Sequence, residues 1–166
     1  MKLLTCNMND QKNIAPMICE LMNYHRKLTN APKEFWQSLE TSEKTFAEWL
    51  ATGEVKKIDH KDETIGFIYL RLGGQSVAWL EDLYIDEKYQ GQGLGKKVMN
   101  MLDEQLKDRG VISMFVDVIP RNPGAIKFYQ ECGFDHLNMI QLRKNYQKRL
   151  DKEETTDLLG FTFKKY

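Results

Sequence analysis

The chain of 166 residues is 42% hydrophobic and 29% charged, and it contains 24 Lys plus Arg against 24 Asp plus Glu. This length and balance are typical of one globular domain and exclude an intrinsically disordered chain. A formal net charge of zero argues against a nucleic-acid-binding protein, which carries a basic excess. No apolar run approaches the roughly 20 residues of a membrane span or forms a secretory signal, so we expect a cytoplasmic protein with no membrane or nucleic-acid partner.

The first third of the chain predicts a short strand followed by two helices. Residues 2–6 form the strand, and a helix follows with Asn13 as its N-cap and Pro16 in its first turn. A second helical region covers about residues 33–50, with a break near Thr41. The apolar stripe of the first helix consists of Ile14, Met17, Ile18, Leu21 and Met22.

The middle third predicts three strands and a helix. Residues 55–60, 64–72 and 77–85 alternate or run apolar and are separated by short polar or glycine turns. A polar loop over residues 86–93 opens a helix that Gly110 ends. The apolar face of this helix consists of Leu94, Val98, Met101, Leu102 and Leu106.

The last third predicts strands around one more short helix. Residues 112–119 form a buried strand, Asn122 caps the helix and Gly133 ends it. Residues 134–137 and 138–146 have the pattern of two final strands. We therefore expect one α/β domain over residues 1–146, with helices flanking a mixed sheet. Residues 147–166 form a C-terminal extension, a charged linker followed by an extra strand from residue 158 that pairs with its own sheet or across a homodimer.

Three glycines alternate between the third predicted strand and the helix that follows it. Gly91, Gly93 and Gly95 leave the backbone bare at a helix start, where unpaired N–H groups and the helix dipole suit a phosphate or pyrophosphate. A P-loop is excluded because Gly95 is followed by Lys96 and another lysine, with no hydroxyl for magnesium. The dinucleotide-binding pattern fits the spacing poorly but stays open, since Asp117 lies about twenty residues further on.

The histidines and cysteines show no spacing that indicates a metal site or a disulfide framework. We expect no metal and three reduced thiols. These residues are His25, His60 and His136, and Cys6, Cys19 and Cys132.

Three motifs follow one another in register between residues 77 and 134. They are Leu80-Glu81-Asp82-Leu83-Tyr84-Ile85, then Gln90-Gly91-Gln92-Gly93-Leu94-Gly95, then Asn122-Pro123-x-Ala125-x-x-Phe128-Tyr129 with Cys132-Gly133-Phe134. The succession resembles the GNAT superfamily of acetyl-coenzyme A-dependent N-acetyltransferases. The resemblance implies a fold in which the central fourth and fifth strands splay apart and the acetyl-pantetheine arm fills the gap.

The same resemblance implies the residues that bind acetyl-coenzyme A. Backbone groups of Leu83 and Ile85 bond the pantetheine, amides from Gln90 to Lys96 surround the pyrophosphate, and Asn122 touches the cofactor arm besides capping its helix. The complete implied set is Leu83, Tyr84, Ile85, Gln90, Gly91, Gln92, Gly93, Leu94, Gly95, Lys96, Asn122, Ala125 and Tyr129.

The resemblance also points to catalytic groups. Tyr129 matches a tyrosine that protonates the departing thiolate, although a buried tyrosine also fits plain core packing. Glu81 and Asp82 are adjacent acids in an apolar strand, and either can attract an ammonium group and take its proton. Strand alternation places the two on opposite faces unless a bulge intervenes, and the sequence leaves open which one is the base.

The function implied is transfer of acetyl from acetyl-coenzyme A to a primary amine by direct attack in a ternary complex. The amine can belong to a small molecule, a polyamine, an aminoglycoside or a peptide. The alternative is a non-catalytic acyl-coenzyme A-binding module with the same fold. Turnover separates the two.

Overall fold

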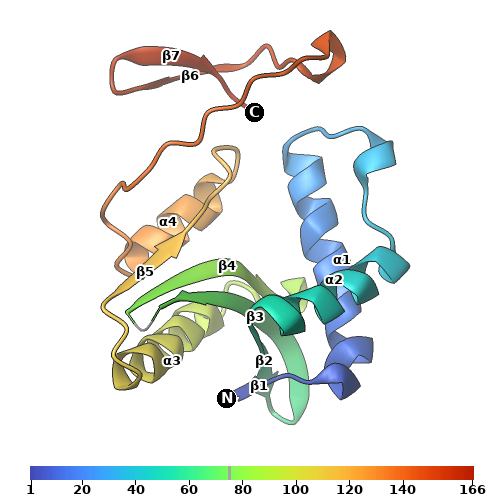
Figure 1. Cartoon of the computed structure of the whole chain (residues 1–166), viewed down its shortest axis with the longest axis vertical. Helices are drawn as coiled ribbons and strands as arrows, with labels where there is room; N and C mark the ends of the chain where they lie inside the picture. The colour runs from blue at the N-terminus through green and yellow to red at the C-terminus, as the bar shows by residue number, and fades with distance from the viewer. Residues whose placement is uncertain (75) are drawn as a thin grey trace. The chain divides into compact units, whose positions relative to one another are not determined.

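A computed structural model describes residues 1–74 and 76–166. These residues divide into two compact units, Met1–Asp117 and Val118–Tyr166 (Figure 1). The first unit holds a five-stranded sheet and its covering helices, and the second holds one α-helix and a two-stranded sheet. No helix within the described residues combines the length and apolar character that crossing a membrane requires.

The five strands of the first unit lie in chain order, β1-β2-β3-β4-β5. All pairs are antiparallel except β4 with β5, which is parallel, so the predicted mixed α/β sheet is confirmed. Between β2 and β3 the chain reverses through Lys61 and Asp62, both at positive φ, as the twist of a two-residue hairpin requires. The strands are β1 (Lys2–Thr5), β2 (Glu54–His60), β3 (Glu63–Gly73), β4 (Val77–Ile85) and β5 (Ser113–Val116).

Two helices precede β2, and their starts differ from the prediction. Helix α1 (Gln11–Leu28) follows a single 3-10 turn that Asn7 caps, so Asn13 lies inside the helix and is not its N-cap. Pro16 consequently sits beyond the first turn. The second region is a short turn over Lys33–Phe35 followed by helix α2 (Leu39–Thr52), whose N-cap is Ser38. The predicted break thus occurs a few residues earlier than Thr41, where a serine can cap the new helix.

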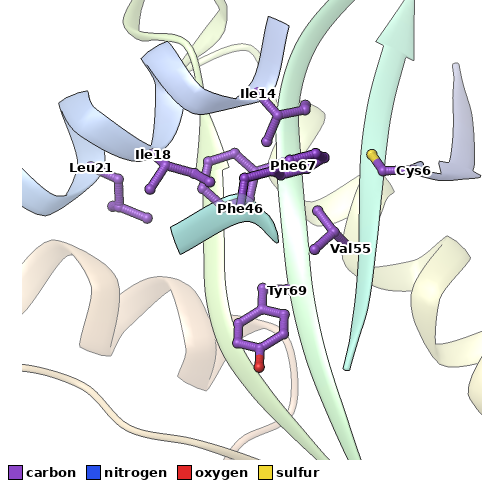
Figure 2. Packing of buried hydrophobic residues seen from close by; sticks show 8 residues of the cluster. All are labelled: Cys6, Ile14, Ile18, Leu21, Phe46, Val55, Phe67 and Tyr69. Carbon is purple, nitrogen blue, oxygen red and sulfur yellow. The ribbon is translucent and has the colours of Figure 1, made fainter. Parts of the chain in front are cut away.

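Helices α1 and α2 pack on one face of the sheet. Figure 2 shows side chains from both helices converging on Phe67 and Tyr69 of β3 and Val55 of β2. Trp49 of α2 stacks on Tyr69 with ring centroids 4.5 Å apart, and the Tyr69 hydroxyl lies 2.8 Å from Thr52 Oγ1. The buried cluster consists of Cys6, Ile14, Ile18, Leu21, Phe46, Val55, Phe67 and Tyr69.

Helix α3 (Leu94–Asp108) lies on the other side of the sheet from α1 and α2 (Figure 1). Strand alternation turns Ile68 and Leu70 away from Phe67 and Tyr69, and both are fully buried. The helix contributes a buried stripe of Leu94, Val98, Met99, Leu102 and Leu106. Its predicted stop is confirmed, because Gly110 follows at φ 77°.

The second unit corrects the predicted end of the chain. Helix α4 (Pro123–Glu131) is capped by Asn122 as predicted, but residues 134–146 form no strand. The segment has alternating apolar residues without a partner strand to bond them, and pattern alone does not make a strand. In place of one extra strand, the tail forms a hairpin of β6 (Thr155–Leu158) and β7 (Phe161–Lys164). Strand β5 is likewise shorter than the predicted residues 112–119.

The tail hairpin is anchored within its own unit by Arg121. The Arg121 guanidinium bonds the Glu154 carboxylate and donates to the Lys165 carbonyl at 2.7 Å. Lys165 in turn bonds Glu154 through its ammonium at 3.0 Å and its backbone N–H at 2.7 Å. Arg121 directly precedes the N-cap of α4, so the hairpin holds the start of that helix.

Candidate functional site

Strand β4 changes its pairing in the middle. On the β3 side, Tyr69 pairs with Asp82 and Leu70 pairs with Leu80, so Glu81 is an extra residue in a β-bulge. On the β5 side, the register ends at Leu80 with Val116. The second half of β4, residues 81–85, therefore continues past the described end of β5. The family resemblance places the splay of the fourth and fifth strands at this point of the sheet, where the described pairing of β4 with β5 ends.

The bulge brings the two carboxylates to one face of the sheet. Asp82 lies opposite Tyr69, and directly paired residues of an antiparallel sheet share a face. Glu81 forms an ion pair with Arg71, which is two residues from Tyr69 and shares that face. The bulge that the sequence analysis allowed as the exception to opposite faces is therefore present in β4.

The environments of the two carboxylates differ. Glu81 is neutralised by the Arg71 guanidinium. Among the described residues, Asp82 has no ion-pair or hydrogen-bonding partner, and its burial, with a smaller contribution from the nearby Glu81 charge, raises its pKa from 3.8 to about 7. A carboxyl group with a pKa near 7 can exchange a proton at neutral pH. Of the two acids, Asp82 is the one suited to that role.

Tyr84 extends this face towards α1. It pairs with Phe67 in the sheet, stacks on its ring at 5.9 Å, and donates a hydrogen bond to Glu20 of α1. Burial, followed by the Glu20 hydrogen bond, raises the pKa of Tyr84, so its hydroxyl stays protonated at neutral pH. Asp82, Tyr84 and Glu20 give the α1 side of β4 acceptor groups for a cation.

The glycine loop joins β4 to α3. After the short turn Glu87–Tyr89, Gly91 and Gly93 both adopt φ 72°, a left-handed conformation that favours glycine. Gly93 is the residue before α3, and no described side chain caps the helix. The first helix amides have no carbonyl one turn earlier to bond, so they remain available to an anion.

The loop fits the pyrophosphate that the sequence predicted there. A Cβ placed on Gly91 or Gly93 would meet no atom within 4 Å, which leaves the space over both residues open to a ligand. The first turn of α3 contains no acidic residue and carries Lys96. Bare amides, the positive end of the helix dipole and a lysine together favour a phosphate group.

The remaining predicted residues lie in the second unit. The Asn122 Oδ1 atom accepts the Ala125 N–H at 3.0 Å, which confirms the cap. Tyr129 packs edge-to-face against Phe128 and Phe134, with centroids 5.1 and 5.4 Å away. Phe134 N–H bonds the Tyr129 carbonyl at 3.0 Å and closes the end of α4.

Two side chains that bond residues of the site were not predicted from the sequence. Arg71 and Glu20 lie ten and sixty-four positions from the partners that they bond. Both are ordinary charged residues at exposed positions of a strand and a helix. Only the pairing register of β3 with β4, and the docking of α1 on the sheet, bring them to the site.

The chain matches the sequence profile of the acetyltransferase (GNAT) family over residues 20–134. It is 35% identical over 83 residues to the [ribosomal protein bS18]-alanine N-acetyltransferase of Escherichia coli K12, covering 50% of this chain and 54% of that protein. Over 76 residues it is 39% identical to the spermine/spermidine N(1)-acetyltransferase of Bacillus subtilis, covering 45% and 49%. A thialysine N-epsilon-acetyltransferase of Sus scrofa is 33% identical over 94 residues, covering 57% and 54%. The chain thus spans about half the length of these curated relatives.

Solved structures share the fold at low sequence identity. A tetramutant of a Bacillus halodurans protein superposes with a TM-score of 0.69 at 19% identity, covering 87% of this chain and all of that one. A GNAT family acetyltransferase from Elizabethkingia anophelis, solved with acetyl-CoA bound, has a TM-score of 0.53 at 21% identity and covers 72% and 75%.

Proposed function

Because the chain belongs to the acetyltransferase (GNAT) family, we propose that it transfers the acetyl group of acetyl-coenzyme A to a primary amine by direct attack in a ternary complex. The observation that carries the proposal is the end of the β4–β5 pairing at Leu80, on the strand that leads through a short turn into the glycine loop. Residues 81–85 of β4 have no partner on the β5 side among the described strands, so a ligand can pair with this edge while the loop takes the charged end of the same ligand.

In this proposal the co-substrate runs along β4. Backbone groups of Leu83 and Ile85 bond the pantetheine arm, and the amides from Gln90 to Lys96 bind the pyrophosphate. A backbone N–H near Leu83 meets the negative charge that develops on the thioester oxygen. The open space over Gly91 and Gly93 and the uncapped start of α3 support this placement.

Asp82 is the base. A primary amine is protonated at neutral pH and must lose a proton before it attacks. The Asp82 carboxylate takes that proton, and the amine nitrogen then bonds the thioester carbonyl carbon. The raised pKa of Asp82 supports this role, whereas Glu81 is already paired with Arg71.

Tyr129 is the acid. When the carbon–sulfur bond breaks, the coenzyme A thiolate takes a proton from the Tyr129 hydroxyl, which the proton released by the amine can later restore. Asn122 caps α4 and contacts the cofactor arm, and Ala125 lies in the first turn of the same helix. The match of the family profile through residue 134 supports carrying these roles over.

The acceptor is a primary amine that approaches from the α1 side of β4. Asp82, Tyr84 and Glu20 lie on that face, and Glu20 and Asp82 as carboxylate attract a cation. The names of three relatives supply a panel of such amines: spermidine, thialysine and a peptide with an N-terminal alanine.

Single substitutions test the chemistry. With acetyl-coenzyme A and the fastest amine of the panel, Asp82→Asn and Tyr129→Phe each lower turnover by about 10²–10⁴-fold, the usual contribution of a general base or acid. The parent rate rises with pH through about 7 as Asp82 ionises, and Asp82→Asn loses this rise.

Glu81→Gln is the matched control, because it removes the neighbouring carboxylate but keeps Asp82. It retains most of the turnover. If both Asp82→Asn and Tyr129→Phe turn over at the parent rate, the catalytic assignment is wrong. If all variants and the parent bind acetyl-coenzyme A without transfer, the chain is an acyl-coenzyme A-binding module.

A further inference from the structure

Glu63 of the β2–β3 hairpin bonds the turn that precedes the glycine loop. This residue is the first of β3. One carboxylate oxygen accepts the Lys88 ammonium at 2.6 Å, and the other accepts the Tyr89 hydroxyl at 2.5 Å. A single side chain of the hairpin thus engages two consecutive residues of the turn.

The same turn is fixed to the sheet at its start. The Asp86 N–H donates to the Ile65 carbonyl at 2.8 Å, and the Asp86 carboxylate accepts the Lys88 N–H at 3.1 Å. The Gln90 side-chain amide reaches back to the Ile85 carbonyl at 2.7 Å. These bonds hold both ends of the Glu87–Tyr89 turn within the chain itself.

One hydrogen bond connects this turn to the glycine loop. The Gln92 side-chain amide donates to the Lys88 carbonyl at 3.0 Å, and Gln92 stands between the two left-handed glycines. A connected path therefore runs from Glu63 through Lys88 to Gln92. Gly91 and Gly93 have more backbone conformational freedom than the other residues of the loop. The hydrogen bond from Gln92, which lies between them, therefore restricts the most flexible part of the loop.

The charge of Lys88 is used inside this network. Its ammonium lies 2.6 Å from Glu63, 3.6 Å from Asp86 and 5.0 Å from the Tyr89 ring centroid. The Glu63 hydrogen bond raises the pKa of Lys88, and the Lys88 hydrogen bond lowers the pKa of Glu63, so both stay charged at neutral pH. Lys88 is thus a tether for the turn, and the attraction for phosphate comes from the start of α3.

We propose that Glu63 is a positioning residue for acetyl-coenzyme A: through Lys88 and Gln92 it holds the glycine loop in the conformation that binds the pyrophosphate. The inference rests on the proposed function, since it assumes that this loop meets the pyrophosphate. A loop that is ordered before binding loses less conformational freedom when the ligand arrives. Loss of Glu63 therefore weakens binding without changing the reacting groups.

The test compares Glu63→Gln with Glu54→Gln. Glu54, like Glu63, accepts two hydrogen bonds, but both come from Arg109, at 2.9 and 2.6 Å, and Glu54 stands at the other end of the β2–β3 hairpin. Calorimetry with acetyl-coenzyme A gives an affinity about 3- to 10-fold weaker for Glu63→Gln. Glu54→Gln binds as the parent does, although its melting temperature falls.

Kinetics separate positioning from general damage. Glu63→Gln raises KM for acetyl-coenzyme A by the same factor and leaves kcat unchanged, because only ground-state binding is lost. With S-acetylpantetheine, which has no pyrophosphate, parent and variant have equal kcat/KM. Equal affinity of parent and Glu63→Gln for acetyl-coenzyme A, or an equal loss with both thioesters, overturns the proposal.

The double variant tests the path itself. If Glu63 acts through Gln92, the affinity lost in Glu63→Gln combined with Gln92→Ala is smaller than the two single losses added together. Strict additivity shows that Glu63 does not act through Gln92. If the parent protein binds no acetyl-coenzyme A, the proposed function itself is contradicted. If the parent binds it and the Glu63 variant binds it equally well, only the positioning role of Glu63 is contradicted.

Discussion

Asp82 has its raised pKa because of its position in the strand. The bulge at Glu81 turns both acids to the face covered by α1 and α2, where Asp82 is half-buried and finds no partner among the described residues. A buried carboxyl group that has no partner is more stable protonated than charged. Its ionisation therefore opposes folding, and this effect can be measured without knowing the substrate.

The first prediction is that Asp82 makes the protein less stable as pH rises. Between about pH 4 and 7 the unfolded chain has released this proton while the folded chain still holds it. The free energy of unfolding falls across this window, by up to about 4 kcal/mol for a shift of about three pKa units. Urea unfolding at pH 5 and pH 8 shows about two-thirds of this loss in the parent, because at pH 5 the unfolded chain has already released the proton.

Asp82→Asn removes the effect, because the amide does not titrate. The variant is more stable than the parent at pH 8, and the difference shrinks at pH 5. Carboxyls with lowered pKa, such as Glu54 and Glu63, affect stability only at lower pH, and His25 titrates equally in both proteins. Equal pH profiles for the two proteins would show that the Asp82 pKa is not raised.

The sequence could predict the acids but not their arrangement. Glu81 and Asp82 stand out because charge is rare in an apolar strand. Their shared face depends on a one-residue register shift against β3, and the choice between them depends on Arg71. Register and long-range ion pairs arise from how strands pair, which a single strand's pattern does not contain.

Helix α3 is bounded by glycines at both ends. Gly93 precedes it at φ 72° and Gly110 follows it at φ 77°, and a Cβ on either would meet no atom within 4 Å. The two positions therefore have the same backbone strain and the same free space. They differ in the ligand that the proposed function places over Gly93.

The second prediction uses this pair. Gly93→Ala and Gly110→Ala each lower the free energy of unfolding by about 1–2 kcal/mol, the cost of a left-handed conformation for an L-residue. Only Gly93→Ala weakens acetyl-coenzyme A binding, by about tenfold or more, because its backbone and added methyl lie where the proposed function places the pyrophosphate. Calorimetry measures the affinity of both variants for acetyl-coenzyme A. Equal affinities would show that the pyrophosphate does not bind at this loop.

The third prediction concerns the C-terminal hairpin. Truncation after Asp151 removes Glu154 and Lys165, the partners of the Arg121 guanidinium. Arg121 is only 14% exposed, so its charge is left without compensation beside the N-cap of α4. The melting temperature of the truncated protein falls, and Arg121→Met in the truncated chain restores part of it. An unchanged melting temperature after truncation would show that the hairpin does not support α4.

Elements with strong local signals were predicted closely. Strand β4 matches residues 77–85, and α4 begins after its Asn122 cap. Residues 134–146 have a strand pattern but no partner, and the tail pairs with itself instead. A strand is completed by its neighbour, so its pattern is necessary and not sufficient.

The residues to which the proposal assigns roles occur in both units of the sequence. The first unit carries Asp82, the second half of β4 and the glycine loop, and the second carries Asn122 and Tyr129. The family profile covers residues 20–134 and includes all of these residues. The order of the motifs was sufficient to predict the family, because each motif is local and their spacing is short.

The most direct test is release of coenzyme A from acetyl-coenzyme A by the purified chain, measured as free thiol across the amine panel. We predict that at least one primary amine accelerates thiol release and gains one acetyl group, seen as a mass increase of the amine. The parent rate with that amine greatly exceeds the rate of Tyr129→Phe. Acetyl-coenzyme A that binds but yields no acetylated amine and no thiol above background would contradict an acetyltransferase.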